Sequence, residues 1–259
     1  MSIEQESSDS FSRTVVFNRT ERLVGETAMA ALSRARVIIF GVGGVGSWTA
    51  EALARTGVGH LTIVDADRVS PTNINRQAEA NVATVGEVKV DAMKRQLLAV
   101  APGIEVTALE KEYTSLTADD FDLEEFDFVI DAIDSLAAKA LLLRNATAAR
   151  HPVVLSSMGA ALKIDPTKIS VAEFWKVQGC PLAASLRRKF KKSGEFPKRK
   201  FKCVYSPELL TNQGGALEED MAMSFNKVAV NGSLCHITAI FGMTLAGLVV
   251  EQIVKAAQG

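Results

Sequence analysis

Short, uninterrupted apolar runs recur along the first 160 residues, and longer segments with helical spacing lie between them. The runs that predict buried strands are residues 35–40, 61–64, 104–109, 126–132 and 153–158. The segments that predict helices are residues 44–56, 87–100 and 137–150. Continuous apolar runs are typical of parallel strands covered on both faces, and their alternation with helices indicates βαβ units. We therefore predict an α/β fold with a doubly wound, Rossmann-like, mostly parallel sheet.

After residue 158 this alternation weakens. Residues 168–174 and 201–205 predict two further strands, and a basic, polar stretch separates them. Residues 227–256 predict a long closing helix, buried in the core or at a dimer interface. Asn231, His236 and several glycines interrupt its apolar run, whose cleanest part falls short of the roughly 20 residues that a membrane span needs. No stable membrane insertion is therefore expected.

The chain shows no internal repeat and no linker rich in proline, glycine or serine. We therefore expect a single domain at residues 13–259, with a first half at residues 13–160 and a decorated C-terminal half at residues 161–259. Residues 1–12 are rich in serine and acidic residues and lack the basic and apolar regions of a signal peptide. They predict a disordered tail.

A glycine-rich motif follows the first predicted strand and opens the first predicted helix. Its glycines are Gly41, Gly43, Gly44 and Gly46. Glycines let the backbone approach phosphates, and a helix N-terminus supplies N–H donors at the positive end of its dipole. Asp65 ends the second predicted strand, where an acidic residue can accept a hydrogen bond from a ribose hydroxyl. The pattern predicts a nucleotide site but does not distinguish NAD, FAD and ATP.

Two cations downstream of this motif favour ATP. Arg76 and Lys89 follow the second predicted strand, and a hydride-transfer enzyme has no obvious need for them there. An enzyme that attacks the α-phosphate of ATP does need fixed cations, because charge grows as pyrophosphate departs. Asp131 and Asp134 lie at the carboxyl end of another predicted strand, where a carboxylate can hold Mg²⁺ on the phosphates. An NAD-dependent oxidoreductase remains the alternative from another class.

The order of these motifs resembles the E1-like superfamily, which adenylates ubiquitin-like and sulfur-carrier proteins. The matching patterns are G-x-G-G-x-G, D-x-D-x-V-x-x-T-N-x-N-R-Q, T-V-G-x-x-K and D-x-x-D, within residues 17–159. The resemblance implies that ATP and Mg²⁺ are the cofactors and that residues 13–160 form the ATP-binding half. It assigns ribose to Asp65, the phosphates to Arg76 and Lys89, and Mg²⁺ to Asp134. Asn73 and Gln77 would help shape the pocket, and Asp67 is a further candidate nucleotide-binding residue. Ser135 stands where this superfamily usually has asparagine.

The segment Phe17-Asn18-Arg19 resembles one that, in homodimeric members, sends an arginine into the partner's ATP site. Arg19 is thus a candidate catalytic residue acting in trans, and the resemblance implies a homodimer. The alternative for Arg19 is a solvated charge at the start of a helix.

The second half resembles the tRNA threonylcarbamoyladenosine dehydratase branch. Paired C-x-x-C zinc ligands, usual in members that activate proteins, are absent, and the segments G-C-P-L-A-A-S-L-R-R and K-C-V-Y-S carry the similarity. This branch adenylates the carboxylate of N6-threonylcarbamoyladenosine, the modified adenosine beside the tRNA anticodon. It then closes the ring and releases AMP and pyrophosphate. The alternatives are activation of the C-terminal carboxylate of a small protein, and a non-catalytic RNA-binding scaffold.

Residues 187–202 hold nine of the 29 basic residues of a chain whose net charge is −1, with Glu195 as their only acid. Phe190, Phe196 and Phe201 are interleaved with them. Such a stretch can grip phosphates and offer faces for unstacked bases, so we predict contact with tRNA. The alternative is a solvated loop that serves solubility.

The composition fits a cytoplasmic protein. Apolar residues make up 47% of the chain, and its three cysteines include no C-x-x-C pair, which fits a reducing compartment. Cys180 and Cys203 are expected to be structural, with a covalent intermediate on either as the alternative, and Cys235 is expected to pack inside the closing helix. The three histidines share no spacing that indicates a metal site. A sulfur-relay protein is a further candidate partner.

Overall fold

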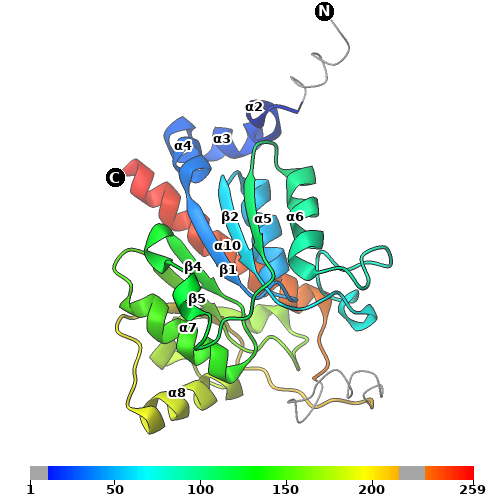
Figure 1. Ribbon diagram of the computed structural model, residues 1–259, viewed down its shortest axis with the longest axis vertical. Helices are drawn as coiled ribbons and strands as arrows, with labels where there is room; N and C mark the ends of the chain where they lie inside the picture. Colours follow the sequence, from blue (N-terminus) through cyan, green and yellow to red (C-terminus); the bar gives the residue numbers. More distant parts are fainter. Residues whose placement is uncertain (1–10, 216–230) are drawn as a thin grey trace, which may run out of the picture.

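The computed structural model describes residues 11–215 and 231–259, and within them the strands form one seven-stranded sheet (Figure 1). The strands are β1 (Arg36–Phe40), β2 (His60–Val64), β3 (Glu105–Leu109), β4 (Phe128–Asp131), β5 (Val153–Ser157), β6 (Ser170–Glu173) and β7 (Lys202–Tyr205). Their order is β3-β2-β1-β4-β5-β7-β6, and β6 runs antiparallel to β7 while the other neighbours are parallel. The predicted doubly wound, mostly parallel sheet is confirmed.

The switch in strand order lies at β1, between β2 and β4. Val37, Ile38 and Ile39 of β1 are fully buried, because helices cover both faces of the strand. Phe40 at its end pairs with Val64 of β2 and Asp131 of β4. The carboxyl ends of these three strands therefore share one edge, where open α/β sheets bind their ligands.

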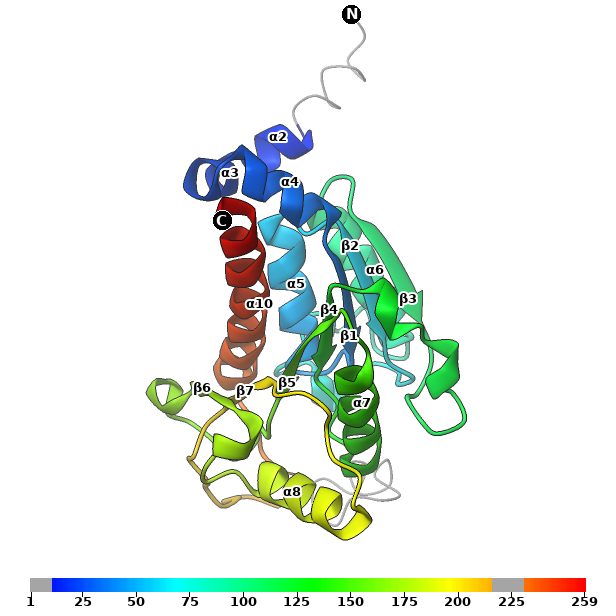
Figure 2. The same ribbon diagram turned by 90° about the vertical axis from the view of Figure 1, so that its left-hand side faces the viewer.

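Two helical layers cover the sheet (Figure 2). The helices are α2 (Arg13–Val16), α3 (Asn18–Val24), α4 (Glu26–Arg34), α5 (Gly46–Thr56), α6 (Lys89–Val100), α7 (Leu136–Ala148), α8 (Pro181–Ser193) and α10 (Cys235–Gln258). Helices α4, α5, α6 and α10 share a core with one face of the sheet, and α7 and α8 pack against the other face. Short 3-10 turns lie at Pro71–Asn73, Ala118–Asp120, Leu123–Glu125, Pro166–Lys168 and Phe174–Lys176.

The closing helix differs from its prediction. It begins at Cys235, because residues 231–234 are not helical, and residues 227–230 of the predicted helix lie outside the described part. By length and composition alone it could cross a membrane. In the structure one side of it packs tightly on α5: a Cβ added at Gly242 would lie 2.5 Å from the carbonyl oxygen of Val45.

The basic stretch also differs from its prediction. The sequence predicted only a basic, polar stretch between the last two strands, whereas its first part forms helix α8. Leu186 and Phe190 are buried on this helix, so a narrow apolar face inside a strongly charged segment was overlooked. Residues 1–10 of the predicted tail lie outside the described part of the chain.

Candidate nucleotide site

The glycine loop connects β1 to α5 at the carboxyl edge of the sheet. Gly41 has a φ of 89°, and a Cβ added there would lie 2.7 Å from the carbonyl oxygen of Ala132. A Cβ added at Gly46 would lie 1.8 Å from the carbonyl oxygen of Gly41. These two glycines are therefore required by the turn itself. A Cβ at Gly43 would meet only the amide of Gln77, at 3.8 Å, so the middle of the loop borders open space.

Asp65, the residue after β2, holds the loop in place. Its two carboxylate oxygens accept hydrogen bonds from the backbone N–H of Val42 (2.7 Å) and from that of Asp67 (2.9 Å). Asp65, the residue predicted to bind ribose, therefore lies directly beside the loop. Its role in ribose binding stays a prediction.

Lys89 is brought to the same edge as the first residue of α6. The residue is only 5% exposed, and its Nζ lies 2.8 Å from Oδ2 of Asp67. Burial lowers the pKa of Lys89, but the carboxylates of Asp65, Asp67 and Glu79 outweigh it and raise the pKa above its ordinary value. Lys89 is therefore a fixed cation at neutral pH.

Arg76 lies on the other side of the loop. Its Cγ would be 3.4 Å from a Cβ added at Gly44. Its guanidinium donates to the carbonyl of Thr72 (2.8 Å), and its own carbonyl accepts from the indole of Trp48 (3.0 Å). The side chain of Asn73 accepts from the backbone N–H of Ser70 (3.1 Å), so it shapes the turn that carries Arg76. The structure thus brings Arg76 and Lys89 to one glycine loop.

Gln77 and Glu79 leave buried acceptors without donors. Among the described residues, no hydrogen bond reaches Oε1 of Gln77 or either carboxyl oxygen of Glu79. The nearby hydroxyl of Ser47 donates instead to the carbonyl of Gly43 (2.7 Å). Glu79 is 1% exposed, and burial raises its pKa to about 7 although Lys89 opposes the shift. Sequence reasoning missed Glu79, because an acid in a loop ordinarily lies in solvent.

The two acids near the end of β4 have different environments. Asp131 is buried in an ion pair with Lys139 of α7, with 2.7 Å between Oδ2 and Nζ, and Ser156 donates to the same oxygen at 2.5 Å. Asp134 is exposed in the turn before α7. Asp131 is therefore committed to the protein, whereas Asp134 is exposed to solvent at this edge. Lys139 was missed, although a lysine within the apolar run L-A-A-K-A-L-L-L is a signal for a buried pair.

Arg19 does not lie with these residues in the same subunit. It is exposed on α3, and the neighbouring Phe17 and Arg13 contact Gly57 at the far end of α5. Helix α5 has 11 residues, so about 16 Å of helix separate that end from the loop. A role for Arg19 at a nucleotide therefore requires the site of a second subunit.

Two of the three cysteines are buried, and the third differs from its prediction. Cys180 and Cys203 are buried, and burial raises the pKa of the Cys203 thiol far above its ordinary value. Cys235 is exposed at the first residue of α10, so its predicted packing inside the helix is wrong. The apolar period of the helix begins only at Ile237, which explains the error.

The basic stretch is also more ordered than its composition indicates. Phe190 and Phe201 are 2% and 4% exposed, so they are core residues and cannot offer faces to a base. Phe196 is 42% exposed and keeps that possibility. Arg187 donates to the carbonyls of Phe174 (3.2 Å) and Val177 (3.0 Å), so part of the charge is used within the fold.

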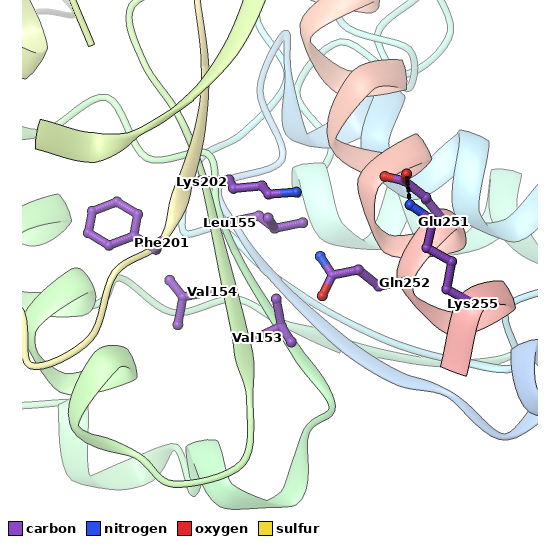
Figure 3. A pocket seen from close by; sticks show the side chains of 8 residues that line it. All are labelled: Val153, Val154, Leu155, Phe201, Lys202, Glu251, Gln252 and Lys255. Atoms are coloured by element: carbon purple, nitrogen blue, oxygen red, sulfur yellow. Dashed lines mark hydrogen bonds and ion pairs between the residues drawn. The ribbon is translucent and has the colours of Figure 1, made fainter. Parts of the chain in front are cut away.

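A cavity of about 380 Å³ lies away from the glycine loop (Figure 3). It opens between the start of β5 and the last turns of α10, and Lys202, Gln252 and Lys255 border it. The loop lies at the opposite edge of the sheet, so this cavity is separate from the candidate nucleotide site.

The switch point, the glycine loop and the two cations near it are the features of a nucleotide-binding α/β protein. The model of the ThiF family matches residues 17–259, and the chain belongs to this family. The resemblance found in the motifs is thereby confirmed.

Relatives cover most of the chain. It is 43% identical to a tRNA threonylcarbamoyladenosine dehydratase of Bacillus subtilis over 69% of this chain and 70% of that protein. The corresponding enzyme of Haemophilus influenzae is 34% identical over 92% of this chain and 93% of its own. The crystal structure of the tRNA N6-threonylcarbamoyladenosine dehydratase of E. coli in complex with ATP matches with a TM-score of 0.82 at 32% identity, covering 96% of this chain and 98% of the other.

Proposed function

We propose that this protein is an ATP-dependent dehydratase of N6-threonylcarbamoyladenosine in tRNA. It adenylates the threonyl carboxylate, closes the ring and releases AMP and pyrophosphate. The observation that carries the proposal is the pair of cations, Arg76 and Lys89, at one glycine loop in a chain whose relatives along nearly its full length are such dehydratases.

The residues at the loop fit ATP. Open space beside Gly43 leaves room for phosphates at the N-terminus of α5, whose N–H groups and dipole favour anions. The orphaned Oε1 of Gln77 is an acceptor that a nucleotide donor or a bound water would satisfy. Arg76 and Lys89 would hold the phosphates, and Asp65 would accept from the ribose.

The residues also fit Mg²⁺ held largely by the phosphates. Within the described residues, no group of three or more His, Cys, Asp or Glu side chains could cage a metal ion. Mg²⁺ commonly binds through one or two carboxylates plus substrate phosphates, and Asp134 is an exposed carboxylate at this edge. When bound, the ion would neutralise phosphate charge.

The chemistry follows from these positions. The threonyl carboxylate attacks the α-phosphorus, and pyrophosphate leaves while Arg76 and Lys89 stabilise the growing negative charge. A nucleophile of the same modified side chain then attacks the activated carbonyl, and AMP leaves with one carboxylate oxygen. Because the second step is intramolecular, proximity replaces an enzyme thiol. The high pKa of Cys203 agrees with a structural role for that residue.

The test adds ATP, Mg²⁺ and threonylcarbamoylated tRNA to the protein and weighs the released nucleoside. Loss of one water, with AMP and pyrophosphate in equal amounts, is the expected result. An unchanged nucleoside would end the proposal. Pyrophosphate exchange that depends on a small partner protein would favour the alternative of protein activation, which the dehydratase relatives and the missing C-x-x-C pairs disfavour.

We also propose a cytoplasmic homodimer in which Arg19 enters the partner's site. Apolar side chains are exposed on α3 (Leu23, 85%) and on α10 (Met243, 44%), and α3 lies beside the end of α10 (Figure 2). Mixing Arg19→Ala with Lys89→Ala subunits should restore part of the activity, because one mixed site keeps both residues. Lack of rescue would argue for a site complete within each subunit. A sulfur-relay protein remains a further candidate partner.

A further inference from the structure

Two exposed aromatic side chains meet at the C-terminal end of α8. Trp175 is 40% exposed and Phe196 is 42% exposed, and their ring centroids lie 6.1 Å apart. They come from different segments, Trp175 from the turn after β6 and Phe196 from the chain that follows α8. Exposed apolar rings that adjoin on the surface can mark a binding site.

A buried aromatic cluster packs under Trp175 of this pair. Phe174 is fully buried and lies edge-on to Trp175 with a centroid distance of 5.0 Å. It stacks on Phe201 at 5.0 Å and contacts Phe190 of α8 at 5.9 Å. The exposed pair is thus the surface of an ordered aromatic core. Rings fixed in this way lose little entropy when a ligand stacks on them.

Lysines frame the aromatic pair. Lysines 191, 192, 198 and 200 are exposed and lie within five residues of Phe196 along the chain, and among the described residues no carboxylate pairs with them. The one acid of the stretch, Glu195, is paired with Arg144 at 2.5 Å. The frame is therefore strongly positive and complements a polyanion.

We propose that Trp175 and Phe196 form a stacking platform for an unstacked base of single-stranded RNA, whose flanking phosphates lie on the surrounding lysines. Exposed aromatic faces combined with cations are the means by which proteins bind single-stranded nucleic acid. The proposal rests on the proposed tRNA substrate and names the part of the protein that holds it.

The position of α8 indicates which part of the RNA reaches the platform. The helix begins beside Gly159, where a Cβ would lie 3.8 Å from Cβ of Leu182, just beyond the carboxyl end of β5. It has 13 residues and so extends about 20 Å from there to the platform. The platform therefore holds a base several nucleotides away from the reacting adenosine, in the same loop or stem end.

The test uses a uridine octamer and an octamer of the same length that lacks its bases, without ATP. The uridine octamer should quench tryptophan fluorescence in the wild type, and Trp175→Phe should bind it equally but without quenching, because the indole of the other tryptophan, Trp48, lies on α5 and donates to the carbonyl of Arg76, outside the platform. Trp175→Ala and Phe196→Ala should each weaken binding about 5- to 100-fold. Leu116→Ala, which removes a side chain that is 92% exposed elsewhere, should bind as the wild type does.

Equal affinity for both octamers, or quenching that survives Trp175→Phe, would overturn the platform. These readouts need no turnover, so they are independent of the proposed reaction. If modified tRNA is converted, Trp175→Ala should raise the KM for tRNA and leave kcat at saturation and the KM for ATP unchanged. Conversion with an unchanged KM would refute the platform and leave the dehydratase proposal standing.

Discussion

The nucleotide edge and the basic surface around α8 are built in opposite ways. At the nucleotide edge the central charges are buried or bonded to the backbone: Lys89 is 5% exposed, and Asp65 accepts two backbone hydrogen bonds, although Asp134 is exposed. Around α8 the lysines and two aromatic rings are exposed, above a core that they do not disturb. Because of this difference, substitutions at the nucleotide edge should affect folding or the chemical step. Substitutions on the surface around α8 should affect only the binding of RNA.

The largest effect is expected from Lys139→Ala. The substitution leaves Asp131 buried and unpaired in a place where burial already raises its pKa. Loss of one partner of a buried ion pair costs about 3–5 kcal/mol of folding free energy. Urea unfolding at pH 7 measures it. Lys255→Ala, which breaks an exposed pair with Glu251, should change little, and Asp131→Asn combined with Lys139→Met should recover part of the loss. Equal losses of unfolding free energy in Lys139→Ala and Lys255→Ala would contradict the distinction between buried and exposed charges.

The next largest effect is on catalysis. Arg76→Ala, Lys89→Ala and Asp134→Ala should each reduce kcat/KM about 100- to 1000-fold, because in the proposed mechanism the two cations stabilise the growing phosphate charge and Asp134 holds Mg²⁺. Formation of AMP with modified tRNA measures this effect. Lys111→Ala, an exposed lysine paired with Asp120, is the control and should remain active. Near-normal formation of AMP by Arg76→Ala and by Lys89→Ala would contradict the proposed role of these two cations.

Glu79→Gln should change how stability depends on pH. Burial raises the pKa of Glu79 from 4.5 to about 7, so the folded protein keeps the proton when the unfolded chain has lost it. Wild-type stability from this group therefore falls as pH rises from about 4.5 to 7, by about 3 kcal/mol. The amide that replaces the carboxyl group does not titrate, so the free energy of unfolding of the variant minus that of the wild type should grow over this window. A constant difference would show that Glu79 titrates normally.

The smallest effect on folding is expected at the lysine frame. Lys192→Gln and Lys198→Gln should leave the urea midpoint unchanged, because both side chains are exposed. Each should make the negative slope of log affinity against log salt for tRNA shallower by about 1, since each would remove one proposed phosphate contact. Lys111→Gln is the matched control and should keep the slope. A loss of stability without a change in slope would assign these lysines to the fold.

The fold could be predicted from the sequence, and so could the residues that lie beside the glycine loop, because both depend on local sequence patterns. The apolar run of β1 and the glycines after it fix a strand, a turn and a helix within 21 residues, 36–56. Asp65, Arg76 and Lys89 follow in an order that places them at the same edge. Their assigned roles at a nucleotide stay predictions.

Other features depend on tertiary contacts that no local pattern records. Glu79 and Lys139 carry charges that ordinarily mark the surface, and only the packed structure shows them to be buried. Helix α8 was hidden because its buried face is narrow within a basic segment. Trp175 was overlooked because its partner, Phe196, is 21 residues away in the sequence.

Arg199 has a consequence for proteolysis. Its guanidinium donates to five carbonyls at the end of α7, those of Ala146, Thr147, Ala149, Arg150 and Pro152. The guanidinium of Arg199 therefore caps the C-terminal, negative end of α7, which lies about fifty residues earlier in the sequence. A protease that cuts after basic residues needs backbone it can draw into an extended form. The bond after Arg199, in one of the most basic segments of the chain, is thus protected until α7 itself gives way.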